Sequence, residues 1–222
     1  MDALKVTFTF TSPVVMDSEY PIHLDALVAW CVADEAESFG APDPWAAGDD
    51  LSHALGKTDA SDAVWVWQAS RLHFVPASER VMMNMIRRCD PLLYMEGFDR
   101  GLIDTKRKSI NSRSGQERAY QFLMPYQWFE RAEAWCLGDR ETLEEVLKRL
   151  RFIGKLSRNG FGVIKDVLVE SDEQAIDRWK VRTLPRSMEG AANVMYVHSF
   201  QCLRAPYWKK PNRVLANEPV VV

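Results

Sequence analysis

Alternation of apolar and polar residues marks the start of the chain as a strand. The segment Leu4–Phe10 (LKVTFTF) alternates with β-branched and aromatic content, which is typical of a half-buried strand. Between Ile22 and Ser38, apolar residues instead recur at helical spacing, with Asp25 near the positive end of the predicted helix. Residues 40–62 are rich in Gly, Pro, Ala and Asp, so we expect a surface connection with at most a short helical turn.

The same reading gives strands through the rest of the chain, at Val64–Ser70, Leu72–Pro76, Val81–Cys89, Trp128–Leu137, Val163–Glu170 and Met195–Leu203. A second helix is expected after Asp139, which is a suitable N-cap. Its apolar face would hold Leu143, Val146, Leu147, Leu150 and Ile153, and Gly154 would end it.

The order of these elements predicts an α+β fold. Strand, helix, strand, insertion, strand, helix and strand is the split βαβ order of a ferredoxin-like domain. We expect one domain over residues 1–222, with an insertion at 77–125 that carries a long β-hairpin and a C-terminal extension at 171–222.

Charge is distributed unevenly along the 222 residues, although the net charge is only −3. Residues 1–62 carry two basic and twelve acidic residues, so the remainder carries a net positive charge. Two stretches concentrate that charge: Lys148 to Lys165 holds six basic residues and no acidic one, and Asp104 to Arg118 holds five basic and two acidic. This asymmetry suggests one face for an anionic partner and another for a different partner, such as a protein. The alternative is that the charges only solvate helices and loops, and the local clustering of basic residues favours the first interpretation.

The glycine-rich loop Gly154–Gly162 (GKLSRNGFG) lies between the second helix and a strand. Its glycines permit positive φ and close approach of a ligand, and its basic and polar side chains suit phosphate. It follows a helix instead of opening one and lacks the G-x-x-x-x-G-K-[ST] spacing, which argues against a nucleoside triphosphate site. From the residues alone, a nucleic-acid contact and an ordinary helix-to-strand turn stay equally open.

A family resemblance adds to this reading. The segment IGKLSRNGFGVIKDV (Ile153–Val167) resembles the glycine-rich loop of the RAMP superfamily of CRISPR-associated proteins. The segment TFTFTSPVVMDSEYPIHLDALVAW (Thr7–Trp30) is similar to the first strand and helix of the handle-capping, Cas-five-like subunit of type IV CRISPR effector complexes, and APYWKK near the C-terminus fits as well.

The resemblance implies a RAMP/RRM-like ferredoxin fold with a protruding β-hairpin thumb, and a non-catalytic RNA-binding role. The subunit would cap the 5′ handle of the CRISPR RNA beside the large subunit and the first backbone subunit; contact with target DNA beside the protospacer is left open. The resemblance places RNA contacts in the loop at Lys155, Ser157, Arg158, Asn159, Gly160, Phe161 and Gly162. By position and charge alone, it places them in the thumb at Lys106, Arg107, Lys108, Arg113 and Arg118.

Two other function classes compete with an RNA-binding subunit. A metal-independent endoribonuclease that processes repeat RNA needs a general base and a general acid, and His23, at the start of the first helix, is the candidate residue. The alternative for His23 is packing or capping at that helix end. A purely structural assembly protein would explain the acidic first third but neither basic stretch.

The remaining sequence patterns mainly argue against particular kinds of site and location. Acidic pairs such as Asp49-Asp50 lack the convergent spacing of a metal site, so we expect no metal and no cofactor. The four cysteines lie far apart and are expected to be reduced core thiols. No apolar run spans a bilayer and no signal peptide is evident, so a cytoplasmic location is expected. In the tail, Trp208, Lys209 and Lys210 suit either RNA contact or packing.

Overall fold

The computed structural model describes residues 1–16, 21–58, 64–87, 90–103, 113–114, 118–207 and 209–220. These residues divide into two compact units, one of residues 1–79 with 127–222 and one of residues 80–126. Each unit is described by itself below.

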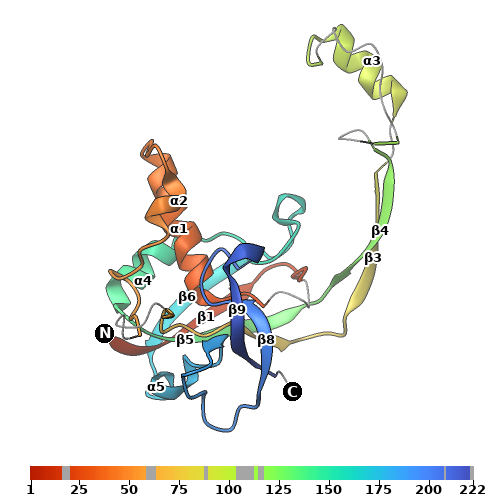
Figure 1. Ribbon diagram of the computed structural model, residues 1–222. Helices are drawn as coiled ribbons and strands as arrows, with labels where there is room; N and C mark the ends of the chain where they lie inside the picture. The colour runs from red at the N-terminus through yellow and green to blue at the C-terminus, as the bar shows by residue number, and fades with distance from the viewer. Residues whose placement is uncertain are drawn as a thin grey trace. The chain divides into compact units, whose positions relative to one another are not determined.

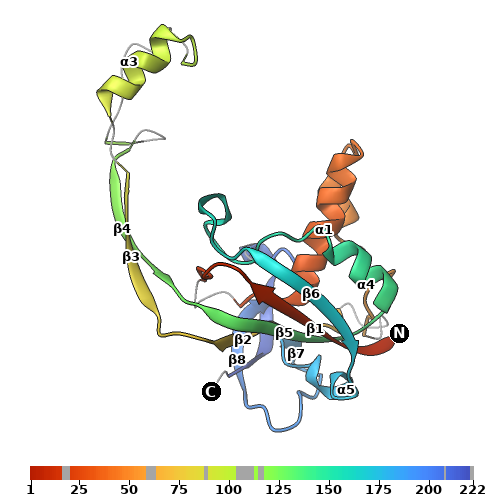
Figure 2. The ribbon, with the colours of Figure 1, turned by 180° about the vertical axis from the view of Figure 1, so that it is seen from behind.

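The first unit is built on a four-stranded antiparallel sheet in the order β2-β5-β1-β6 (Figure 1). Its strands are β1 (Asp2–Phe10), β2 (His73–Pro76), β5 (Phe129–Gly138) and β6 (Ile164–Ser171). The fold is therefore α+β, and this order and direction of strands are compatible with a ferredoxin-like domain. Figure 2 shows β1 and β6 side by side from behind.

The core lies on one face of this sheet because alternate residues of a strand point to the same side. Leu4, Val6 and Phe8 of β1 are fully buried and pair with apolar residues of β5. They pack in one cluster with buried residues of two helices, α1 (Leu24–Ser38) and α4 (Arg140–Leu147). The unit also contains two short helices, α2 (Pro44–Ala47) and α5 (Ala175–Arg178).

Three expectations for this unit are corrected. Helix α4 ends at Leu147, although Leu150 and Ile153 beyond it are still buried, because an apolar periodicity does not show where the backbone leaves the helix. Residues 64–70, which the structure describes throughout, form isolated β-bridges instead of the predicted strand. Residues 40–62 are not merely a surface connection, since Leu51 and Leu55 are fully buried.

A second sheet follows in the C-terminal part of this unit, with strands in the order β7-β9-β8. These are β7 (Leu184–Pro185), β8 (Tyr196–Cys202) and β9 (Arg213–Pro219). The strand predicted at Met195–Leu203 is confirmed as β8. The pattern missed β7 and β9, because two residues are too short for a periodicity and β9 carries Asn217 and Glu218 beside its apolar positions.

The second unit contains β3 (Val81–Arg87) and β4 (Tyr120–Tyr126), which pair antiparallel over seven residues each. Helix α3 (Pro91–Asp99) lies between them in the sequence and was not predicted; Asp90 caps it by accepting the backbone N–H of Leu92. Gly97 is the only buried residue among those described in this unit. Little apolar burial therefore stabilises it.

Candidate nucleic-acid interface

The glycine-rich loop connects α4 to β6 and has an unusual backbone. A short 3₁₀ turn, Ser157–Asn159, lies at its centre. Gly154, Gly160 and Gly162 all have positive φ (96°, 83° and 67°), and so does Leu156 (60°). In Figures 1 and 2 the loop is the teal turn that projects beyond the sheet. The three glycines are thus required by conformation, as the sequence indicated.

Two of these glycines are also required by packing against the protein's own backbone. A Cβ at Gly162 would lie 1.8 Å from the carbonyl oxygen of Ile153, and one at Gly154 would lie 2.6 Å from that of Val15. At Gly160 a Cβ would meet nothing within 4 Å. Of the three, Gly160 is therefore the one that leaves space for a ligand.

Hydrogen bonds hold the loop from the segment that follows β1. The backbone N–H of Lys155 donates to the carbonyl oxygen of Val15 (2.7 Å), and that of Gly162 donates to Pro13 (2.8 Å). The N–H of Val163 donates to the hydroxyl oxygen of Ser12 (2.8 Å). Both ends of the loop are consequently fixed, and its tip is presented on a rigid base.

Most side chains assigned to RNA contact lie at the surface of this loop. Lys155, Arg158, Asn159 and Gly160 are exposed, whereas Ser157 and Phe161 are half-buried. Gly162 is buried, and its predicted contact with RNA stays a prediction from sequence. Exposed cations beside a left-handed glycine are chemically suited to phosphate oxygens.

The basic residues between Lys148 and Lys165 have more than one role. Arg149 forms ion pairs with Asp34 (3.7 Å) and Glu35 (2.9 Å) of α1, which ties α4 to that helix. Lys148, Arg151 and Lys165 line a groove of about 700 Å³ between α4 and β6. Glu144 and Asp166 line the same groove, so the groove carries charges of both signs, whereas the run from Lys148 to Lys165 itself contains no acidic residue.

The predicted contacts in the insertion belong to the second unit. Lys106, Arg107 and Lys108 lie outside the described residues. Arg113 and Arg118 are described and exposed. These positions remain predictions from sequence.

His23 lies at the N-cap of α1, and its side chain makes no capping hydrogen bond. It is 2% exposed and its ring stacks on Tyr207, with the centroids 4.2 Å apart and the planes at 10°. Burial lowers the pKa of His23 well below its usual value, and the nearby Arg182 and Arg71 lower it further. A buried, stacked imidazole fits the packing role better than general acid–base chemistry on RNA.

His23 borders a buried polar cluster that sequence reasoning missed. Arg182 and Asp25 are both fully buried and lie 3.5 Å apart, and the hydroxyl of Tyr207 donates to the Asp25 carboxylate at 2.8 Å. Arg182 also donates to the carbonyl oxygens of Trp67, Ala69 and Leu203. Burial raises the pKa of Asp25, against the opposing effect of Arg182. The cluster connects the C-terminal extension to α1. Its members are up to 182 positions apart in the sequence, so no local motif indicates it.

A cavity of about 570 Å³ lies beside this cluster. Arg204 lines it and places its guanidinium 3.7 Å from the ring centroid of Trp65, which Lys57 also approaches at 3.9 Å. Lys209 lines the same cavity and is exposed, as is Lys210, whereas Trp208 lies outside the described residues. Additional cations thus lie on the C-terminal extension.

The described residues provide neither a metal-binding cluster nor a membrane-spanning helix. They contain no group of three or more His, Cys, Asp or Glu side chains arranged to hold a metal ion. None of their helices is both long and apolar enough to cross a bilayer.

A comparison with known protein families identifies the family of the chain. A family model described as CRISPR type IV associated protein Csf3 matches residues 2–219. No curated protein matches the chain. The match covers the loop, the insertion and nearly all of the C-terminal extension, and it confirms the resemblance to type IV CRISPR-associated proteins.

Proposed function

The chain belongs to the Csf3 family of CRISPR type IV associated proteins, and we propose that it is a non-catalytic RNA-binding subunit of a type IV effector complex. In this role it caps the 5′ repeat-derived handle of the CRISPR RNA. The observation that carries the proposal is the glycine-rich loop, which presents Lys155 and Arg158 at the surface on a backbone held by residues 12–15.

Phosphate contacts dominate the proposed binding. The loop offers cations and an open left-handed glycine, Gly160, but few groups that would read a base edge. In this proposal Phe161, which is half-buried, stacks on an unpaired base with the exposed part of its ring. Affinity should therefore fall steeply as salt rises, with specificity from a few unstacked bases of the handle.

The proposal includes the RAMP form of the ferredoxin-like fold. The strand order β2-β5-β1-β6 supports it, and the β3–β4 pair with its basic connection is the proposed thumb. In this proposal Lys106, Arg107, Lys108, Arg113 and Arg118 follow RNA phosphates and reach the first backbone subunit. The large subunit is the second proposed protein partner, and the cytoplasm is the proposed location.

The test separates a binder from a nuclease. The chain is purified from cells that transcribe the CRISPR array, the bound RNA is sequenced, and fresh repeat RNA is then incubated with the protein in EDTA. We expect bound RNA that shares the 5′ handle, and repeat RNA that stays intact, because His23 is buried and stacked on Tyr207. Specific cleavage in EDTA that disappears in His23→Ala would establish the endoribonuclease instead. Bound RNA without a common handle would contradict the capping role.

A further inference from the structure

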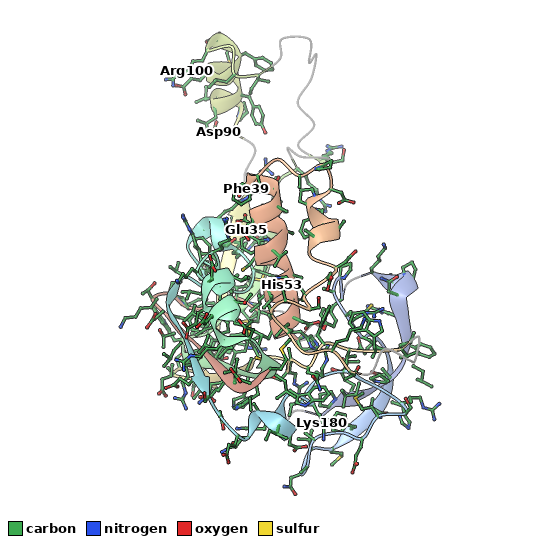
Figure 3. The ribbon with its side chains drawn as sticks, turned by 90° about the vertical axis from the view of Figure 1, so that its left-hand side faces the viewer. Glu35, Phe39, His53, Asp90, Arg100 and Lys180 are labelled. Atoms are coloured by element: carbon green, nitrogen blue, oxygen red, sulfur yellow. The ribbon has the colours of Figure 1, made fainter. Side chains whose placement is uncertain are left out.

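Three large aromatic side chains are exposed on and next to α1 and α2: Trp30 lies within α1, Phe39 is its C-cap residue and Trp45 belongs to α2. Trp30 is 42% exposed, Phe39 is 80% exposed and Trp45 is 69% exposed. Together with the acidic residues around them we call this surface, residues 30–50, the acidic projection. Figure 3 shows α1 with Glu35 along it and Phe39 at its end, and α2 beside it.

These aromatic residues do not belong to the core. The side of α1 that faces the sheet holds Leu24, Val28 and Cys31, all fully buried, and Trp30 lies on the opposite side by helical spacing. Trp30 shares that outer side with Glu37, seven residues later. The rings are therefore presented to solvent.

The projection is also rigid. Asp43 caps α2 by accepting the backbone N–H of Ala46 (3.3 Å), which fixes the start of the helix that carries Trp45. Gly48, just after α2, packs closely against α1, since a Cβ there would lie 2.8 Å from the carbonyl oxygen of Ala29. Large aromatic groups held rigidly at a surface lose little conformational entropy on binding, as is typical of interface anchors.

Charge decides which kind of macromolecule fits this surface. From residue 24 to residue 56 the chain contains no Lys or Arg. The exposed carboxylates are those of Glu37, Asp43, Asp49 and Asp50, with Asp34 and Glu35 turned to Arg149. Such a surface repels the phosphates of RNA and attracts a basic surface.

We propose that the acidic projection is a docking surface for a basic protein subunit of the same effector complex. That partner offers apolar groups to the exposed parts of Trp30, Phe39 and Trp45, and Lys and Arg that face the carboxylates. The exposed parts of the three rings amount to roughly 300 to 500 Å², about half of what one partner buries in a standard interface. The inference deepens the proposed function, because it rests on the chain's being part of such a complex and assigns one surface to a partner.

The first test uses the complex, assembled by co-expressing its protein subunits with a CRISPR RNA and isolated through a tag on this chain. The variant Trp30→Ser/Phe39→Ser/Trp45→Ser should lower the recovery of one protein subunit about tenfold or more, because it removes the anchors. The control Ile176→Ser/Val197→Ser/Phe200→Ser removes three other exposed apolar side chains and should leave recovery unchanged. Unfolding of the isolated variants in urea checks that both stay folded under the assay conditions, because Trp30 and Val197 are each more than half buried and their loss costs some stability.

The second test addresses charge with Glu37→Lys, an exposed position on the outer side of α1. Recovery of the same subunit should fall about threefold and depend more steeply on salt than in wild type. The isolated Trp30→Ser/Phe39→Ser/Trp45→Ser variant should bind handle RNA as wild type does.

Three results would overturn the inference. One is an unchanged set of subunits in the triple variant. Another is weaker RNA binding by the isolated variant, which would make the projection a nucleic-acid surface. The third is self-association of the isolated wild-type chain that the triple variant abolishes, which would make the occupant a second copy. If the wild-type chain binds no RNA but the variant still loses a subunit, the docking surface stands and the proposed RNA role fails.

Discussion

The glycine-rich loop and the acidic projection present opposite chemistry from the same unit. In the loop the backbone is the specialised part: positive φ at Gly154, Gly160 and Gly162 places exposed cations on a fixed base. In the projection most of the backbone belongs to α1 and α2, and the exposed aromatic and acidic side chains are the specialised part. If both proposals hold, the phosphate surface and the protein surface are built from different parts of this unit, so each can be altered without the other.

The largest effect is predicted for a substitution at Gly162, which disrupts the backbone of the loop. In Gly162→Ala the new Cβ would lie 1.8 Å from the carbonyl oxygen of Ile153, so the backbone must move. We expect a loss of more than about 3 kcal/mol in the free energy of unfolding, measured by urea denaturation, or failure to fold. A midpoint equal to that of wild type would show that the loop is not built on this contact.

A smaller effect on stability is expected at two glycines of matching conformation, one in the loop and one in the projection. Gly160 in the loop and Gly40 in the projection have similar φ (83° and 76°), and a Cβ at either would meet nothing within 4 Å. Each substitution to Ala should cost about 1 to 2 kcal/mol of stability, from the left-handed backbone alone. Gly160→Ala should in addition weaken RNA binding about threefold or more, because the Cβ enters the space left for phosphate, whereas Gly40→Ala should not.

Binding isotherms with handle RNA at constant salt make this measurement. Equal affinities for the two variants would mean that RNA does not approach Gly160. Weaker binding by Gly40→Ala alone would place the RNA at the projection and reverse the two assignments.

The sequence predicted the central sheet well because its signals are local. The alternation in Leu4–Phe10 reappears as fully buried Leu4, Val6 and Phe8. Asp139 acts as the predicted N-cap, accepting the backbone N–H of Thr142 (2.9 Å). The predicted end of α4 was wrong because apolar burial continues to Ile153 after the backbone has left the helix.

For the candidate site, the sequence revealed charge and conformation but not contacts. The run from Lys148 to Lys165 and its glycines could be read directly, whereas the pairing of Arg149 with Asp34 and Glu35 on α1 could not. The cluster of Asp25, Arg182 and Tyr207 depends on residues far apart in the chain. The exposure of Trp30, Phe39 and Trp45 also needed the structure, because apolar residues in a sequence are first assigned to the core.

RNA binding through the loop is tested most directly by Lys155→Ala/Arg158→Ala, compared with Arg140→Ala/Arg186→Ala. Both variants remove two exposed cations, but only the first removes them from the loop. We measure the affinity for handle RNA over a range of salt concentrations. The loop variant should bind roughly 10- to 100-fold more weakly, and its dependence of log K on log salt should be shallower by about 1.4, the value for two lost phosphate contacts on single-stranded RNA. Equal losses of affinity in the two variants, or none in the loop variant, would contradict the assignment of this loop to RNA.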